Sequence, residues 1–520
     1  MKMVKSLILG SAAGLVALSG AQAADLPVKA KAVEYVRICS LYGAGFYYIP
    51  GTDTCIKLGG YLRVDMGVNT NSVYTGDYST QGGLGNRYTN AYSWRSREDL
   101  NIDTRTATEY GVVRTFFDAT FTWTDDTYSA SGTNALGTIY SQLGASGIGA
   151  PGNANSGGVA TGALGVYYAF IQFAGFTIGK AISPFSAPWT AYPGNNYDAL
   201  VGGGGTVTGV NQFVYTAQFG NGVSATVGFQ DPTQYYQAGN VNFGVFGTAN
   251  SFNGVSDVGG TVFPDIVGNV QVMQAWGLAQ VSVAAHDNRA MYYINQTAAV
   301  PNVQFGHPDD KWGFAVQGAL SVNLPQLGVG DVVNVQGVYT NGATRYNIQD
   351  LASGAGAWTT FAGSSVPGAI GSVGFGAAPD SVFNFAGQQQ LISTWGGRGG
   401  YTHNWNPYWN TSIYGAYAYV SYGSTTNGTS AGSIVCASIA ATATIALTAA
   451  CNPNYSVTQL GTVTRWTPVK NLTFSGEFVY SHLQQNQQGF VLANGGNGFG
   501  TYAIANQNTY QVLLRAQRNW

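Results

Sequence analysis

Charged residues are the scarcest group in this chain. Asp, Glu, Lys and Arg make up 8% of its 520 residues, against about 25% in soluble globular domains. A soluble surface needs charge, whereas a surface that faces lipid does not. The near-neutral balance and the lack of a basic patch argue against nucleic acid as a partner, because nothing would hold its phosphates. A secreted glycine-rich adhesin or β-solenoid could be equally poor in charge and stays open as an alternative.

Sustained helical patterns are also missing. No stretch carries an apolar stripe of period 3.6 with capping residues at its ends, so long helices are not expected. The uncharged segment 432–451 resembles a membrane-spanning helix in hydropathy, but it is rich in small residues, interrupted by Ser and Thr, and bounded by cysteines. A helix inserted between strands of a closed antiparallel sheet would also break its connectivity. We therefore interpret 432–451 as an extracellular loop tied by a disulfide.

The chain has only four cysteines, Cys39, Cys55, Cys436 and Cys451. An even number in an oxidising compartment suggests disulfides. Three pairings are possible, and we favour the two local ones. Each would close a loop of about 15 residues, worth roughly 3 kcal/mol in the chain-entropy model. No histidine accompanies either pair at metal-ligand spacing, so we expect neither a metal site nor a cofactor.

What the chain does contain is alternation of apolar and polar residues. Its last residues, 510–520, place one kind on each parity. Strand side chains alternate between two faces, so this segment reads as a ribbon with one apolar and one polar side. A final aromatic residue is typical of outer-membrane β-barrels. The apolar parity holds Tyr510, Val512, Leu514, Ala516 and Trp520, and the polar parity holds Gln511, Arg515, Gln517 and Asn519.

The same alternation recurs along the chain. It covers 56–67, 94–105, 112–123, 212–230, 311–323 and 471–480. Asn221-Gly222, between two alternating runs, is a strong hairpin signal. Some connections are tight, as at 219–223, and others are long and rich in Gly, Ser, Asn and Thr, as at 124–161, 231–262 and 343–385. Short turns at one end and long loops at the other predict an all-β fold, a transmembrane antiparallel β-barrel. Its lipid-facing side chains should include Phe117, Phe121, Phe213, Trp312 and Phe474.

The N-terminus predicts export. Lys2 and Lys5 precede an apolar run over 7–18, which is about 12 residues and too short to span a bilayer. Ala21-Gln22-Ala23 follows as a cleavage site, so 1–23 is expected to be a signal peptide cut before Ala24. No domain boundary is visible in 24–520, which is long enough for 16 strands of roughly 10 residues each.

Charge gathers on the polar parity of the early strands. Two interpretations are compatible with it. Opposite charges on neighbouring strands can pair and fill space inside the barrel, and rows of fixed charge facing a water-filled pore can select ions. The residues are Arg63, Arg95, Arg97, Arg105 and Arg114, with Asp65, Asp99, Asp103 and Asp118.

A candidate constriction follows the strand expected over Val166–Lys180. Pro184, Pro188 and Pro193 exclude a central strand there. The same segment carries four aromatic residues that would be costly in water, so we expect it to fold into the barrel. Asp198 is its acid and could face the arginines across the gap. A surface loop capped by aromatics is the alternative. The aromatic residues are Phe185, Trp189, Tyr192 and Tyr197.

Residues 33–63, with Cys39 and Cys55, closely resemble the N-terminal signature of the alphaproteobacterial general porins, the rhizobial and Brucella-type outer-membrane porins. The segment 168–179 and the aromatic end are similar too. The resemblance implies a 16-stranded barrel in the outer-membrane lipid, a homotrimer, passive diffusion of small hydrophilic solutes and ions, and an inward-folded third loop, placed on 182–205. The single acid in that loop leaves the sign of ion selectivity open. Cys436 and Cys451 are not part of the signature.

Two other functions were weighed against a general porin. An outer-membrane enzyme would need a nucleophile or acid–base constellation, and none of the four histidines, His286, His307, His403 and His482, lies in a recognisable motif. A substrate-specific channel could use the many tyrosines as an aromatic path, but tyrosine is equally expected in the interfacial girdles. The sequence therefore predicts a porin rather than an enzyme.

Overall fold

The computed structural model describes most of the chain beyond its N-terminal segment. All statements below concern these parts. The described residues are 37–69, 92–124, 163–189, 192–197, 200–205, 208–233, 235–243, 255–256, 258–293, 303–348, 359–361, 372–384, 387–442, 445–495 and 498–520.

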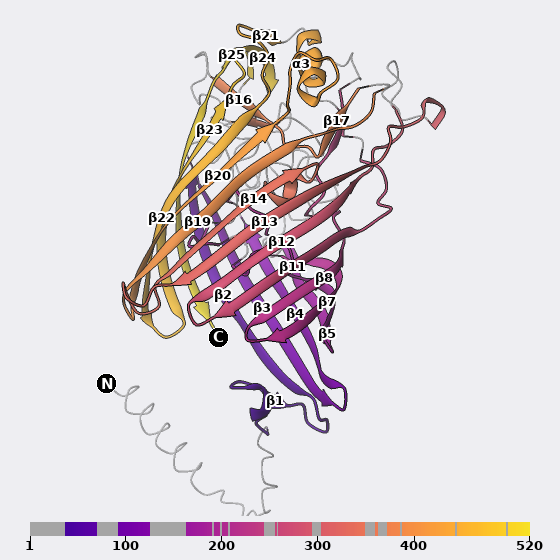
Figure 1. Ribbon diagram of the computed structural model, residues 1–520. Helices are drawn as coiled ribbons and strands as arrows, with labels where there is room; N and C mark the ends of the chain where they lie inside the picture. Colours follow the sequence, from indigo (N-terminus) through magenta and orange to yellow (C-terminus); the bar gives the residue numbers. More distant parts are fainter. Residues whose placement is uncertain are drawn as a thin grey trace, which may run out of the picture.

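Sixteen antiparallel strands form a closed barrel (Figure 1), which confirms the predicted fold and strand number. Each strand pairs with the next along the barrel, and the last strand returns to pair with the first. Closure leaves no sheet edge facing lipid. The barrel strands are β2 (Cys55–Asn69), β3 (Tyr92–Thr108), β4 (Gly111–Thr124), β5 (Ala163–Phe173), β6 (Phe176–Ala181), β7 (Val210–Gly220), β8 (Val223–Gln230), β11 (Asp265–Gln274), β12 (Gly277–Asn288), β13 (Lys311–Asn323), β14 (Val332–Asn341), β19 (Ser393–Asn406), β20 (Trp409–Ser421), β22 (Tyr455–Val469), β23 (Leu472–Gln485) and β26 (Gln507–Asn519).

Shorter elements are not part of the barrel wall. Four strands pair in the order β10-β9-β17-β18, and five in the order β15-β16-β25-β24-β21. The elements are β1 (Tyr47–Tyr48), β9 (Asn240–Asn242), β10 (Val255–Ser256), β15 (Thr359–Phe361), β16 (Ser372–Gly376), β17 (Ser381–Phe383), β18 (Gln390–Leu391), β21 (Ile445–Leu447), β24 (Gly489–Gly495), β25 (Gly498–Ile504), the helix α3 (Ala431–Ala441), and the 3₁₀ turns η1 (Ser40–Tyr42), η4 (Val303–Phe305) and η5 (Thr344–Tyr346).

The two faces of the wall differ as the alternation predicts. Phe117, Phe121, Phe213, Trp312 and Phe474 are between 38% and 53% exposed on the outer face. Polar side chains of the opposite parity point inward and are buried, as in Gln317 and Gln511. The apolar core of the molecule accordingly lies inside the barrel, where loops pack against the inner wall.

Two-residue turns join several strand pairs. Asn221 and Gly222 take φ values of 49° and 73°, the left-handed pair that a tight hairpin requires, so the predicted turn is confirmed. The single strand expected over Val166–Lys180 is wrong. The chain reverses at Ala174 and Gly175, with φ values of 49° and 88°, and forms the hairpin of β5 and β6. The apolar residues on both sides concealed this turn, because an Ala-Gly pair carries a weaker turn signal than Asn-Gly.

The described parts of the long connections, among them β16, β17, β21, β24 and β25, gather at the end of the barrel that carries α3 (Figure 1). Longer loops mark the extracellular end of such barrels. The segment 432–451 lies here, between β20 and β22, as a loop that contains α3 and β21. The helix was not predicted, but it has only 11 residues. Among the described residues no helix is long and apolar enough to cross a membrane. The loop predicted over 124–161 falls almost entirely outside the described residues.

Both predicted disulfides are confirmed, Cys39–Cys55 and Cys436–Cys451. The first ties η1 and β1 to the beginning of β2, at the turn end of the barrel. Cys39, Cys55 and Phe46 form a small buried cluster there. The second joins α3 to the chain that enters β22, so it staples the loop on which it lies.

Asp331 organises the turn between β13 and β14. It accepts hydrogen bonds from the Asn404 backbone N–H at 2.8 Å and the Tyr401 hydroxyl at 2.7 Å, and His403 Nδ1 lies 2.7 Å away. Burial alone would raise the pKa of Asp331, but these hydrogen bonds outweigh it and lower the pKa to about 2. The carboxylate therefore ties β14 to β19 at the turn end.

Replacing Asp331 with Asn should lower stability, because the side chain keeps its size but loses its charge. The pKa of Asp331 is lower in the folded protein than in the unfolded chain. Its contribution to the free energy of unfolding is therefore complete above about pH 4 and is lost as the pH falls toward 2. Urea unfolding midpoints in lipid vesicles should differ between wild type and Asp331→Asn at pH 7 and converge near pH 2. A gap that is equal at both pH values would contradict this assignment.

Candidate functional site

The third loop of the barrel joins β6 to β7, and its described residues, 182–189, 192–197, 200–205 and 208–209, fold into the lumen. Phe185 is completely buried and Tyr197 is 1% exposed. The Phe185 ring lies 4.6 Å from that of Tyr346, which stacks on Tyr236 at 4.4 Å. The inward fold predicted for 182–205 is thus confirmed, and the alternative of a surface loop capped by aromatics is wrong.

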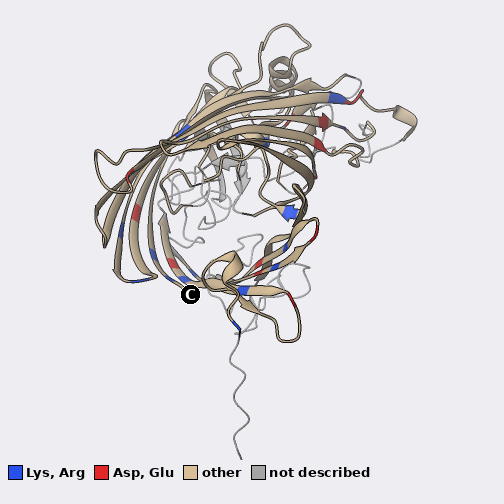
Figure 2. Cartoon of the chain, turned by 60° about the horizontal axis from the view of Figure 1, so that its bottom comes forward, with Lys and Arg blue, Asp and Glu red and all other residues tan. Residues whose placement is uncertain are grey.

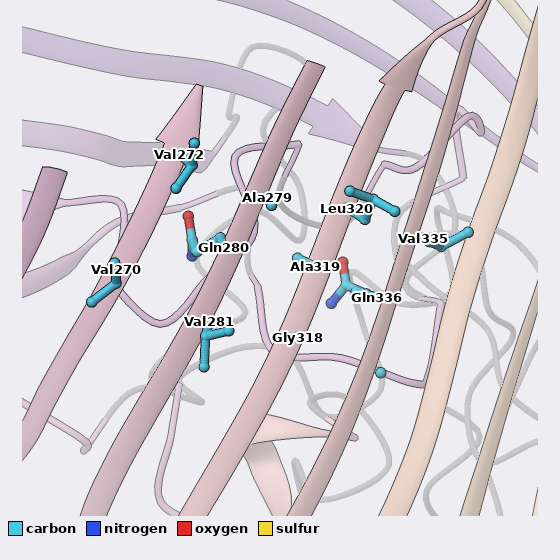
Figure 3. A pocket seen from close by; sticks show the side chains of 11 residues that line it. Val270, Val272, Ala279, Gln280, Val281, Gly318, Ala319, Leu320, Val335 and Gln336 are labelled. Carbon is cyan, nitrogen blue, oxygen red and sulfur yellow. The ribbon is translucent and has the colours of Figure 1, made fainter. Parts of the chain in front are cut away.

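Amide side chains of β11–β14 hold the first part of the third loop. The loop has no regular structure of its own here, so its carbonyl groups need partners from the wall. Gln280 and Gln336, which come from β12 and β14, are shown in Figure 3. The bonds join Asn269 Nδ2 to the Pro184 carbonyl (2.6 Å), Gln280 Nε2 to the Ser186 carbonyl (2.9 Å), Gln317 Nε2 to the Phe185 carbonyl (2.9 Å), and Trp189 Nε1 to Gln336 Oε1 (2.9 Å).

Charged side chains of β19, β22 and β23 hold the second part. Arg398 Nη1 donates to the Leu200 carbonyl at 2.8 Å. Arg465 Nη2 donates to the Gly194 carbonyl at 2.9 Å and to Asn196 Oδ1 at 3.0 Å. The Asn196 backbone N–H in turn donates to Glu477 Oε1 at 2.9 Å. The third loop is therefore fastened along the wall from β11 to β23.

The charged wall on β2–β4 holds its arginines by shared carboxylates. Asp65 lies 2.8 Å from Arg95 and 2.6 Å from Arg515 of β26. Asp103 binds two arginines as well, Arg105 at 2.9 Å and Arg114 at 3.0 Å. In both clusters one carboxylate binds two guanidinium groups, and among the described residues the Asp103 cluster retains an excess positive charge.

The other predicted charges have different partners. Arg63 donates from Nε to Gln517 Oε1 at 2.8 Å, and its guanidinium lies 4.4 Å from the Tyr61 ring centroid. Arg97 Nε donates to Thr122 Oγ1 at 2.9 Å. Asn101 Nδ2 donates to both Asp99 (2.6 Å) and Asp118 (3.1 Å) and so holds two carboxyl groups together. Asp198 lies outside the described residues, so its expected position opposite the arginines stays a prediction.

The described charged side chains of β2–β4 named above, and Arg515 of β26, belong to the inward parity and point into the barrel. Figure 2 shows blue and red segments along adjacent strands of the wall next to the C-terminus. The ion-pairing and pore-facing interpretations therefore describe the same residues, although their part in a constriction stays a prediction. The lumen-facing cations of the described strands are Lys57, Arg63, Arg95, Arg97, Arg105, Arg114, Lys311, Arg398, Arg465 and Arg515, and the acids are Asp65, Asp99, Asp103, Asp118, Asp265 and Glu477.

The site predicted from the sequence did not include Arg398, Arg465, Arg515 and Glu477. Arg515 and Glu477 stood on polar parities already identified, so the signal existed but was not used. Arg398 lies in a Gly-Gly-Arg-Gly-Gly run whose glycines hide the alternation. These residues matter only because barrel closure places β19–β26 around the same lumen.

A shallow hollow of about 620 Å³ marks the wall of β11–β14 (Figure 3). It forms where Gly318 and Gly337 stand directly opposite each other on β13 and β14. Val270, Val281 and Leu320, which border it, are exposed on the outer face. This hollow therefore faces lipid and is not part of the pore.

A closed barrel with an apolar exterior, an inward third loop and a charged inner wall is the architecture of an outer-membrane diffusion channel. A family model described as "Porin subfamily" matches residues 25–512. The chain belongs to this porin subfamily. It is an outer-membrane porin that forms a water-filled channel for passive diffusion, and thus a channel rather than an enzyme.

Relatives and solved structures agree. The chain is 32% identical over 322 residues to "Porin Omp2b" of Brucella suis biovar 1 (strain 1330), covering 61% of this chain and 74% of that protein. It is 33% identical over 321 residues to "Porin Omp2b" of Brucella canis, with the same coverage. The outer membrane channel DcaP of Acinetobacter baumannii superposes with a TM-score of 0.52 at 13% identity, covering 91% of this chain and 99% of DcaP. That likeness shows the fold alone.

Glu477 should keep the third loop still. Replacing it with Leu removes the acceptor of the Asn196 N–H and of the Tyr414 hydroxyl, which donates to it at 2.7 Å. The lost Asn196 bond to a charged group weakens the attachment of the loop by roughly 1.5–3 kcal/mol, and the Tyr414 hydroxyl on β20 loses its acceptor as well. Single-channel recordings of Glu477→Leu should show more current noise and brief closures. Glu477→Gln, which retains Oε1, is the matched control, and equally quiet traces from Glu477→Leu would contradict the role.

Proposed function

We propose that small hydrophilic solutes and ions pass through the gap between the third loop and the charged wall of β2–β4, without chemistry on the solute. The observation that carries this proposal is where the loop is attached. Near its two ends the loop also bonds to the neighbouring strands β5, β7 and β8. Its other hydrogen bonds to the wall run to β11–β14, β19, β22 and β23, and in the order of the barrel strands β13 and β14 stand opposite β3 and β4. Arg63, Arg105 and Arg114, which are partly exposed, then face the remaining water-filled space.

We further propose that the channel prefers anions. Cations outnumber acids among the lumen-facing residues of the described strands. Asp103 is shared by Arg105 and Arg114, and among the described residues this cluster keeps an unbalanced positive charge. Arg63, whose described partners are the neutral Gln517 and Tyr61, adds to this field.

Planar-bilayer recordings test the pore and its selectivity together. The purified protein should give stepwise conductance in KCl, and a salt gradient should give a reversal potential of the sign for anions. The double change Arg63→Gln and Arg97→Gln should lower the anion-to-cation permeability ratio about two- to fourfold per charge, since a unit charge about 5–8 Å away in water is worth roughly 0.5–0.8 kcal/mol.

Arg518→Gln is the matched control for this experiment. Arg518 lies on the same strand as the lumen-facing Arg515 but pairs with the outward Leu62, which is 53% exposed. Its loss should leave the reversal potential unchanged. No stepwise conductance would rule out the channel proposal, whereas a cation preference in the wild type would rule out only the proposed sign.

We also propose that the chain works as a homotrimer in outer-membrane lipid after removal of residues 1–23. The charged n-region, apolar h-region and Ala-Gln-Ala site support cleavage, and the resemblance of 33–63 to general porins supports the trimer. Native mass spectrometry of protein extracted from outer membranes should show three copies, each beginning at Ala24. A monomer would contradict the assembly, and a mass that includes residues 1–23 would contradict the cleavage.

A further inference from the structure

A recess of about 450 Å³ opens in the inner wall of β4–β8, beside the start of the third loop. Its strand residues all belong to the inward parity, so the recess adjoins the lumen and not the lipid. It combines aromatic and aliphatic groups with one arginine and several amides and hydroxyls. The lining residues are Arg114, Phe116, Tyr168, Phe170, Gln172, Thr177, Ala181, Ile182, Pro184, Gln212, Val214, Thr216 and Thr226.

Three aromatic rings form one side of this aromatic recess. Phe116 pairs directly with Phe170 across β4 and β5, and their ring centroids are 5.4 Å apart. Tyr168 follows at 6.2 Å from Phe116. These rings are only half-buried, in contrast to Phe185 of the third loop, which is completely buried. Apolar surface left open toward water favours a ligand that covers it.

Arg114 is held rigidly at one end of the rings. Its guanidinium carbon lies 5.0 Å from the Phe116 centroid and 5.5 Å from that of Phe170. Asp103 accepts from Nε and Nη2, and Gln172 accepts from Nη1 at 3.0 Å. A guanidinium has five N–H groups, so these bonds leave one N–H on each terminal nitrogen for a ligand. The Arg114 side chain is 27% exposed, which makes those groups reachable.

The charges at the two ends of the recess favour one orientation of a bound ligand. Near Arg114, the single carboxylate of Asp103 is shared with Arg105, which leaves this end positive. At the other end, Asp118 stands opposite Tyr168 in the register of β4 and β5. An anionic group is therefore drawn to the Arg114 end and repelled from the Tyr168 end, so a ligand with one carboxylate and one ring has a single favoured orientation.

We propose that the aromatic recess is a transit site for small aromatic monocarboxylates, with the carboxylate on Arg114 and the ring against Phe116, Phe170 and Tyr168. This inference rests on the proposed diffusion function and names a class of solute within it. Stacked aromatic pairs and the charge-assisted hydrogen bonds of a guanidinium supply the attraction. The site lies in an open lumen, so binding is brief and slows the solute without sealing the pore.

Benzoate is the simplest probe, and acetate is its control because it has the carboxylate without the ring. Added to a single channel conducting KCl, benzoate should reduce the current with a defined half-inhibition concentration, and acetate should do so only at concentrations at least tenfold higher. Phe170→Leu keeps an apolar group of similar size without the ring face. It should raise the half-inhibition concentration of benzoate about three- to tenfold and leave that of acetate unchanged.

Arg114→Gln should weaken benzoate about tenfold or more, because it removes the charged donors. Phe213→Leu is the control for a lipid-facing ring, since Phe213 is 51% exposed on the outer face, and it should change nothing. Each variant must first show stepwise KCl conductance, which also monitors folding. Absence of conductance in the wild type would defeat the proposed function itself. Normal conductance with benzoate acting like acetate, or with both recess variants matching wild type, would overturn the aromatic recess alone.

Discussion

The antiparallel pairing of β26 with β2 is the interaction on which the whole structure depends. It runs from Tyr61 opposite Asn519 to Asn69 opposite Gln511 and converts a ribbon of strands into a closed ring. Without it, two edges would present unpaired N–H and C=O groups to hydrocarbon, each at a cost of several kcal/mol. Closure also creates an inside and an outside. Alternate side chains of each strand therefore lie in different environments, with Phe121 or Phe213 in lipid and Gln317 or Gln511 in the interior.

The enclosed interior explains how an irregular third loop can exist at membrane depth. Backbone without helix or strand is tolerated there only where protein or water satisfies its polar groups. The inner wall does this with Asn269, Gln280 and Gln317 on one side and with Arg398, Arg465 and Glu477 farther round. In the proposed function, anchoring the loop to this arc of the wall places the solute path along the opposite arc, on β2–β4.

The charged wall combines rigidity with an unbalanced field. A carboxylate shared between two guanidinium groups, as in Asp65 and Asp103, fixes both arginines, and among the described residues Asp103 neutralises only one of its two. Fixed charges act on a passing ion more effectively than mobile ones, because no reorganisation is needed as the ion arrives. The same Asp103 that balances part of the charge also orients Arg114 beside Phe116 and Phe170. The proposed selectivity for anions and the proposed affinity for aromatic acids thus share one structural element.

The sequence by itself determined the two-faced strands, the inward course of the proline- and aromatic-rich loop, and the local disulfides. These are consequences of short-range chemistry, since a strand between lipid and water must alternate every second residue. The sequence did not indicate the chain reversal at Ala174-Gly175, because apolar residues continue on both sides of it. Only the tertiary structure decided which wall holds the third loop. Trp189 and Gln336 are 147 residues apart, and Asn196 and Glu477 are 281 apart. Such contacts depend on barrel circumference and register, which are set by all sixteen strands together and by no single segment.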